Sequence, residues 1–291
     1  MMRGLQSLIE ELEQDRSLDE PERLRERIEA VDRLDIYLPD GLSPVLDSNS
    51  AEAQFHLRAR SLYTQFETAN FELYQTIRGE IQRATGPYCL LRWVPDRSGE
   101  WADLAKGDGY DYLDELISGV LDFEKPDAEG VAPAQEMVFY QPTPARHIFD
   151  LIDRIALTER DVLVDLGSGL GHVPLLVSIC TNARSIGVEV EAAYVDCARR
   201  CAERLNRNNV TFLQRDARLA DLSSGTVFYL YTPFTGNVLR AVLDRLRQEA
   251  IGREIRICTF GPCTPIIAKE LWLESLGVLE PDRVAIFSSR H

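Results

Sequence analysis

Residues 161–174 read DVLVDLGSGLGHVP, where three glycines, two residues apart, follow a short apolar run that contains an aspartate. The run Val162–Leu166 is typical of a buried parallel strand, and the apolar segment that begins at His172 is typical of a helix. Backbone N–H groups and the helix N-terminus point into such a turn, so it favours an anionic or polar ligand. The glycine spacing then decides which ligand.

Strand-like and helix-like runs alternate from residue 135 onward. This alternation predicts an α/β fold with a doubly wound, mostly parallel sheet and helices on both faces. The strand after residue 270 is harder to place, and it could run antiparallel to its neighbours. The strand-like runs are 161–167, 183–190, 210–216, 226–234, 253–261 and 282–289, and the helix-like runs are 143–156, 172–181, 191–207 and 236–250.

The first 134 residues lack this alternation and have helical patterns instead. The longest covers residues 51–85, about 50 Å of helix at 1.5 Å per residue. Its apolar stripe needs a partner, either the other helices or a second copy of the chain. We therefore expect a helical domain over 1–134, acting as a substrate cap or partner-binding unit, and a ligand-binding domain over 135–291. The stripe consists of Leu62, Phe66, Leu73, Ile77 and Ile81.

Charge is unevenly distributed along the 291 residues, whose formal net charge is −15. Residues 1–134 hold 28 acidic and 14 basic side chains, whereas residues 135–291 hold 19 and 18. An acidic front half disfavours nucleic acid and suits a basic partner, with simple solubility as the alternative. The acidic start and the lack of a run of about 20 apolar residues predict a cytoplasmic protein without membrane spans.

The six cysteines form no CxxC pair and have apolar neighbours, which favours reduced thiols. Cys197 and Cys201 lie one helical turn apart and are the one pair that could share a metal. Because no histidine lies near them in the sequence, we predict no metal site.

The glycines form the pattern D-x-G-x-G-x-G, with Asp165 before Gly167, Gly169 and Gly171. A dinucleotide fingerprint would be G-x-G-x-x-G, but His172 stands where its third glycine belongs, which argues against the alternative of a nicotinamide enzyme. The pattern looks like the S-adenosylmethionine site of class I methyltransferases.

Each part of this pattern has a chemical role toward S-adenosylmethionine. The glycines let the backbone approach the ligand without a Cβ in the way. Asp165 offers a carboxylate to the ligand's ammonium group, and Glu189, which ends the next strand, can accept both ribose hydroxyls. Asp216 ends the strand after that and can accept from the adenine amino group, or it can cap the following turn.

The stretch from about 138 to 236 resembles the non-SET histone lysine methyltransferase family. That family has a Tyr-x-x-Thr loop, a helix, V-D-L-G-S-G-x-G, a second helix and G-V-E. The resemblance implies a seven-stranded methyltransferase sheet and a loop that folds over the methionine end of the cofactor. Thr143 before Pro144 could equally cap the next helix. The matching residues are Tyr140, Thr143, Asp165, Gly167, Ser168, Gly169, Gly171 and Glu189.

The chain departs from this family near the expected acceptor. Tyr231 and Thr232 stand where the family has paired asparagines, although Gly236 is kept. Ala217 replaces the aromatic residue that stacks on adenine in the family. These departures weaken the case for a lysine substrate but leave the cofactor unchanged.

Tyr140 and Tyr231 are the candidate catalytic residues, because their hydroxyls could orient an amine or alcohol; packing alone is the alternative role. We therefore expect an S-adenosylmethionine-dependent methyltransferase with a protein or small-molecule acceptor. A cofactor-binding sensor or scaffold without transferase activity is the alternative from another class. A homodimer through the long helix is a further expectation.

Overall fold

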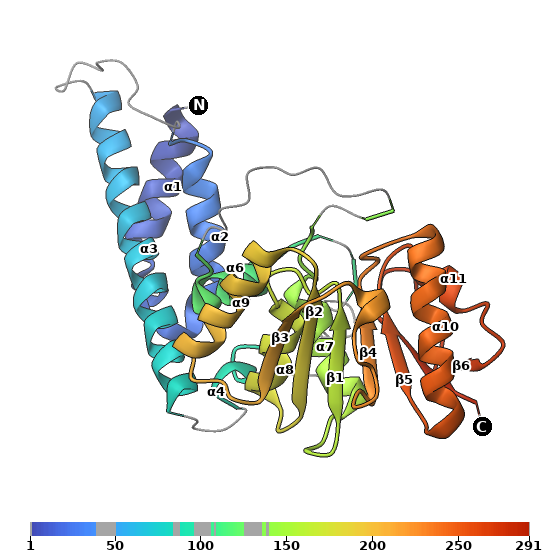
Figure 1. The fold of residues 1–291 in the computed structure, drawn as a ribbon. Coiled ribbons are helices and arrows are strands. Elements are labelled where there is room, and N and C mark those ends of the chain that lie inside the picture. The colour runs from blue at the N-terminus through green and yellow to red at the C-terminus, as the bar shows by residue number, and fades with distance from the viewer. Residues whose placement is uncertain are drawn as a thin grey trace. The chain divides into compact units, whose positions relative to one another are not determined.

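The computed structural model describes residues 2–38, 51–83, 88–95, 106–107, 109–124, 136–137 and 140–290. The chain divides into two compact units (Figure 1). The first comprises Met1–Gly79 and Asp111–Val120, and the second comprises Glu80–Tyr110 and Leu121–His291. The domain boundary expected at residue 134, and the role given to each side of it, stay predictions.

A seven-stranded sheet in the order β3-β2-β1-β4-β5-β7-β6 forms the centre of the second unit (Figure 1). The pairs from β3 across to β5 are parallel, whereas β7 runs antiparallel to both β5 and β6. The prediction of a doubly wound, mostly parallel methyltransferase sheet is confirmed. The strands are β1 Val162–Leu166, β2 Arg184–Glu189, β3 Val210–Gln214, β4 Val227–Leu230, β5 Arg256–Thr259, β6 Leu273–Ser275 and β7 Ala285–Ser289.

Helices connect these strands close to where the sequence places them. The apolar side of α10 packs on buried residues of β1, β4 and β5 in one continuous core. The sequence did not predict β6, which is only three residues long, or the short helix α11. The helices and turns of this unit are α4 Tyr88–Leu91, α7 Ala145–Ile155, α8 His172–Cys180, α9 Ala192–Arg204, η3 Ala217–Leu219, α10 Gly236–Gly252 and α11 Thr264–Ile267.

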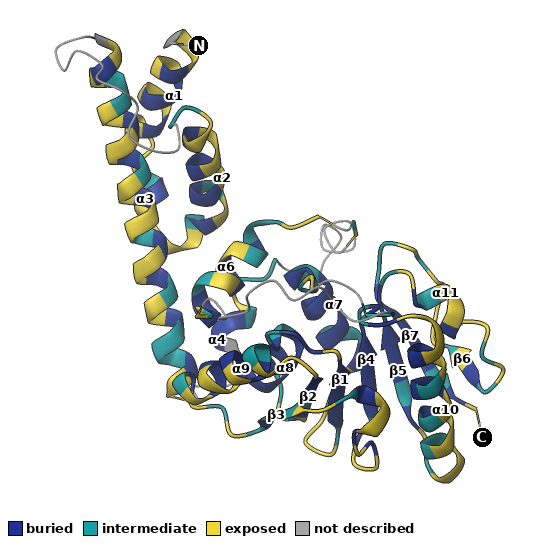
Figure 2. Ribbon diagram, turned by 45° about the horizontal axis from the view of Figure 1, so that its top comes forward, coloured by how far each residue is buried: buried dark blue, intermediate teal, exposed yellow. Residues whose placement is uncertain are grey.

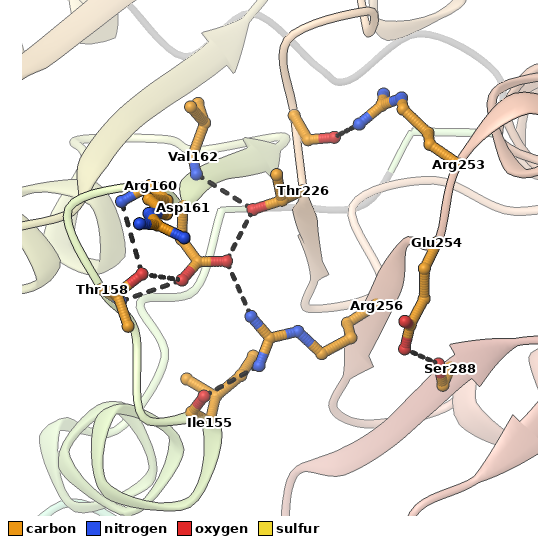
Figure 3. Close-up of polar contacts among 11 residues, drawn as sticks. Ile155, Thr158, Arg160, Asp161, Val162, Thr226, Arg253, Glu254, Arg256 and Ser288 are labelled. Atoms are coloured by element: carbon orange, nitrogen blue, oxygen red, sulfur yellow. Dashed lines mark hydrogen bonds and ion pairs between the residues drawn. The ribbon is translucent and has the colours of Figure 1, made fainter.

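The amino edge of the sheet is held by a polar network around Asp161 (Figure 3). One carboxylate oxygen of Asp161 accepts from Thr226 Oγ1 at 3.0 Å and from the Arg256 guanidinium at 2.8 Å. The other oxygen accepts from the Thr158 amide and hydroxyl at 2.9 and 2.8 Å. These contacts join the starts of β1, β4 and β5, which fixes their register at this edge.

The first unit is helical, as expected, and it packs around one face of its longest helix. Buried side chains of α1 and α2 cover the part of the α3 stripe around Leu62 and Phe66. Of the two partners considered for that stripe, the other helices are the ones observed. Figure 2 shows the buried stripe of α3 facing α1 and α2, with exposed residues on the opposite face. The elements are α1 Met2–Gln14, η1 Arg16–Asp19, η2 Pro21–Arg23, α2 Leu24–Asp35, α3 Ala51–Gln82 and α6 Tyr112–Leu121.

Within the part of the chain that the structure describes, no helix is both long and apolar enough to cross a bilayer.

Candidate functional site

The glycine turn links β1 to α8 and has left-handed backbone at all three glycines. Their φ values are +90° at Gly167, +52° at Gly169 and +87° at Gly171, a region that side chains with a Cβ rarely adopt. A Cβ would also lie 2.2 Å from Pro233 at Gly167 and 2.0 Å from the Tyr140 ring at Gly169. The turn is therefore glycine-rich for two reasons at once, backbone conformation and close neighbours.

The third glycine is required by packing. A Cβ on Gly171 would lie 2.5 Å from the Phe212 ring, and one on Gly187 would meet the same ring at the same distance. The sequence interpretation attributed all three glycines to ligand approach, whereas Gly171 makes room for a side chain of β3. Its contact with a cofactor stays a prediction.

Tyr140 lies over the glycine turn. Its ring covers Gly169 and packs against Tyr194 of α9, with ring centroids 5.2 Å apart. Its hydroxyl is 3.1 Å from His172 Nδ1 at the start of α8. Burial raises the pKa of Tyr140, although a hydrogen bond with the Leu170 backbone opposes this, so the phenol stays protonated at neutral pH. Sequence reasoning missed Tyr194 because nothing in its local spacing marks it.

Thr143 fixes the end of the same loop, but it does so differently from the capping role considered above. Pro144 is the N-cap residue of α7, and no side chain caps this helix. The Thr143 hydroxyl lies 2.9 Å from the hydroxyl of Tyr229, which is buried on β4. The loop that carries Tyr140 is thus tied to the central strands.

Two buried carboxylates, Asp165 and Glu189, lie near each other at the carboxyl ends of β1 and β2. Burial, together with repulsion from Glu189, raises the pKa of Asp165 well above its usual value. One Glu189 oxygen accepts from the Gly169 amide at 2.8 Å, and the other accepts from Val190 and Glu191 amides at 2.7 and 3.0 Å. A carboxylate offers about four lone-pair sites, so three backbone donors leave about one for a ligand.

Ser168 lies in the glycine turn, between Gly167 and Gly169. Its hydroxyl is buried and has no hydrogen-bond partner within the described residues. An unpaired buried hydroxyl costs free energy that a bound ligand or water can recover.

Asp216 and Ala217 occupy the loop after β3. Asp216 caps η3, because its carboxylate accepts from the Arg218 amide at 2.8 Å. It also pairs with the Arg218 guanidinium at 2.6 Å, and this hydrogen bond lowers the pKa of Asp216. Ala217 is buried in the core. Of the two roles considered for Asp216, capping is the one observed, and the adenine contact stays a prediction.

The turn after β4 brings Tyr231, Thr232 and Pro233 to the same edge of the sheet. Thr232 has a left-handed backbone, with φ of +39°. Its hydroxyl donates to the Phe260 carbonyl at 3.1 Å and accepts from the Cys263 amide at 3.0 Å. The Tyr231 ring packs on Phe260 with centroids 5.1 Å apart. Thr232 therefore braces the turn, while Pro233 covers Gly167.

Glu136 is a residue that sequence reasoning missed. Its carboxylate accepts from the amides of Asn237 and Val238 at 3.1 and 3.2 Å, so it caps α10 from 100 residues earlier in the chain. Met137 also forms a bridge with Phe234. Gly236 has a φ of +54°, and a Cβ on it would lie 2.6 Å from the Glu136 carboxylate. These contacts join the start of the Tyr140 loop to the Tyr231 turn.

The Cys197 and Cys201 thiols point to backbone rather than to a shared metal. Cys197 Sγ donates to the Glu124 carbonyl at 3.1 Å and Cys201 Sγ to the Leu121 carbonyl at 3.3 Å. Two neighbouring arginines of α9 also contact this segment, since Arg200 and Arg204 both pair with Glu124. In the described ranges no three potential ligands gather as a metal site would need.

One stretch of the chain matches a known protein family. Residues 136–223 match the sequence model of the histone methylation protein DOT1, which is about a third of the chain. No curated protein matches the chain.

Solved structures with a similar fold include an RNA methyltransferase from Salinibacter ruber in complex with S-adenosyl-L-homocysteine. It shares 22% identity over 51% of this chain and 92% of its own, with a TM-score of 0.40. A precorrin-6y C5,15-methyltransferase from Geobacter metallireducens shares 18% identity over 56% and 95%, with a TM-score of 0.39. An S-adenosylmethionine-dependent methyltransferase from Aquifex aeolicus shares 16% identity over 49% and 87%, with a TM-score of 0.38.

The strand order, the glycine motif and the family match define the class: this is a class I S-adenosylmethionine-dependent methyltransferase. Its motifs resemble those of the non-SET histone lysine methyltransferases, as the sequence predicts. The chemistry of the site fits the cofactor, because two buried carboxylates, Asp165 and Glu189, lie together at the carboxyl ends of β1 and β2, and the ammonium and ribose groups of the cofactor are hydrogen-bond donors. The mutual repulsion of Asp165 and Glu189 also favours a cationic ligand.

Proposed function

We propose that this methyltransferase modifies a side chain of a basic protein. The observation that carries the proposal is the match of residues 136–223 to the histone methylation protein DOT1. The net charge of −15 supports it, since an acidic enzyme attracts a basic partner at long range. The helical unit would recruit this partner, and the buried free cysteines are in keeping with a cytoplasmic protein.

The cofactor would be held along the carboxyl edge of the sheet. Asp165 would bind the ammonium group, Glu189 the ribose, and Asp216 the adenine amino group beside Ala217. Gly167, Ser168, Gly169 and Gly171 would provide the turn, and Tyr140, Thr143 and Thr232 would enclose the methionine end. Arg218 now occupies the Asp216 carboxylate, so adenine binding requires this exposed arginine to share or release it.

The acceptor would lie between the Tyr140 loop and the Tyr231 turn. The cofactor supplies an activated methyl group, so the protein's contribution is to hold the acceptor in line with it and to keep water out. Both phenols could accept a hydrogen bond from an incoming amine or donate one to an alcohol. The Tyr231 hydroxyl takes the place of the amides that the histone-directed family has here, which would change the hydrogen bonds offered to the acceptor.

Glu136 would set the distance between these two parts of the site. It binds the N-terminus of α10, which directly follows the turn of Tyr231, and it precedes Tyr140 by only four residues. Without its carboxylate, the loop over the cofactor would lose its hydrogen bonds to the start of α10 and keep the Met137–Phe234 bridge.

Methyl transfer can be tested with radiolabelled S-adenosylmethionine and a fractionated lysate. We expect label to enter a basic protein, and to stay at background with the Glu189→Ala variant. Label in small molecules would replace the proposal with metabolite methylation. Cofactor binding without transfer to any fraction would support a sensor or scaffold instead.

A further inference from the structure

The outer face of α3, opposite α1 and α2, consists of exposed residues (Figure 2), and two of them are large apolar side chains. Leu57 is 66% exposed and Phe71 is 59% exposed. Each lies seven residues from Thr64, so all three share one side of the helix. A shallow groove on this face is lined by Leu57, Arg60, Ser61, Thr64, Gln65 and Thr68.

We propose that this face binds the same face of a second copy of the chain, with the two α3 helices antiparallel and a two-fold axis near Thr64. Leu57 then packs against Phe71 of the second copy, and the symmetry repeats this contact on the other side of the axis. The small side chains Ser61, Thr64 and Thr68 lie between these contacts and allow the helices to approach closely.

Charges on one flank of this face fit the arrangement. Arg60 lies four residues before Thr64 and Glu67 lies three after it, so each meets the other across an antiparallel pair. On the opposite flank Arg58 is already paired with Glu13 of its own chain at 2.5 Å, so the charges that pair across the axis are those of Arg60 and Glu67.

The surroundings of Glu67 favour the arrival of a cation. Burial and repulsion from Glu115 and Asp32 raise the pKa of Glu67. Neither Glu67 nor Arg60 forms an ion pair with any described residue of its own chain. Arg60 of the second copy would supply the missing positive charge.

A parallel arrangement is disfavoured by the same residues. It would place Arg60 beside Arg60 and Glu67 beside Glu67, and like charges at such positions are destabilising. The charge pattern thus selects the direction as well as the partner.

Charge reversal tests the pairing in the full-length chain by sedimentation equilibrium. Arg60→Glu places two acids together at two symmetric sites, so we expect dimer affinity to fall about tenfold or more, or about 1.4 kcal/mol. Combining Arg60→Glu with Glu67→Arg should restore it. Arg25→Glu, which alters an exposed pair within α2, is the control and should leave the dimer unchanged.

Single cysteines test the direction. Under mild oxidation Thr64→Cys should form a disulfide-linked dimer, whereas Leu57→Cys should not, because residue 57 lies far from its own copy in an antiparallel pair. Linkage at both positions would show a parallel pair and overturn the proposal. A wild-type chain that is monomeric throughout, or a double charge variant that fails to recover, would also overturn it.

Discussion

Carboxylates at the two edges of the sheet differ in their hydrogen bonds and in the direction of their pKa shifts. Asp161 and Asp165, which belong to the same segment, show the difference. Asp161, before β1, has four hydrogen-bond donors from the protein itself. Burial acts against ionisation there, but the bonds from Thr158, Thr226 and Arg256 prevail and hold the pKa of Asp161 below its usual value. Asp165, four residues later, has a raised pKa because of burial and Glu189.

This difference distinguishes a carboxylate that stabilises the fold from one that is suited to binding a ligand. A carboxylate whose donors come from the fold stabilises the native state, whereas a buried carboxylate beside another acid destabilises it until a ligand arrives. The contacts of Asp161 therefore stabilise the fold, whereas the surroundings of Asp165 are those expected of a site for a cationic ligand.

The largest expected effect is that of Asp165→Asn. Loss of the charge opposite the ligand's ammonium should weaken S-adenosylmethionine binding about 100-fold, near 2.8 kcal/mol, which lies within the range for hydrogen bonds to charged groups. The melting temperature of the free protein should rise, since the substitution removes a buried charge. Calorimetric titration and thermal unfolding would measure the two effects. A lower melting temperature would show that Asp165 is structural like Asp161.

Asp161→Ala should behave in the converse manner. Removing the acceptor of four hydrogen bonds should lower the free energy of unfolding by about 2–3 kcal/mol. Cofactor affinity should be unchanged, because Asp161 lies at the opposite edge of the sheet. Urea unfolding and calorimetry on the same sample would check this, with the exposed Asp244→Ala as control. Weakened cofactor binding would mean that the two edges are coupled.

Glu136→Ala tests the link between the Tyr140 loop and α10 at the carboxyl edge of the sheet. We expect S-adenosylhomocysteine to bind about tenfold more weakly, because the Tyr140 loop loses its link to α10, whereas adenosine should bind as before. Glu254→Ala, which removes a hydrogen bond with Ser288 near the amino edge, is the matched control (Figure 3). Equal losses for the two ligands would point to general destabilisation instead.

The smallest expected effect is on the pH dependence of stability, which has opposite signs for Asp161 and Asp165. The lowered pKa of Asp161 contributes stability above the unfolded value of 3.8, which is lost as pH falls through the folded value. The raised pKa of Asp165 contributes stability at low pH that is lost as pH rises through its folded value. Cofactor affinity should accordingly increase as Asp165 ionises, and this increase should be absent in Asp165→Asn.

Much of this architecture follows from local sequence patterns. Alternating apolar runs predict six of the seven strands, and the glycine motif places Gly167 and Gly169 at the site because their backbone conformation excludes other residues. The contacts of Glu136 and Phe212 could not be predicted, since they join positions far apart in the sequence. Asp216 shows a further limit, because a carboxylate at a strand end can serve the ligand or the turn, and sequence alone does not choose.

The way the chain alternates between its two compact units limits how the protein could have evolved. The first unit contains Asp111–Val120, which is bounded on both sides by segments of the sheet-containing unit. The chain therefore passes between the units three times, and one genetic exchange at a single point could neither add nor remove the helical unit whole. Residues that follow α6 are moreover bound by α9, where Arg204 donates to the carbonyl of Asp122 at 2.5 Å. The two units are thus expected to have diverged together, as one gene, rather than to have been combined from interchangeable modules.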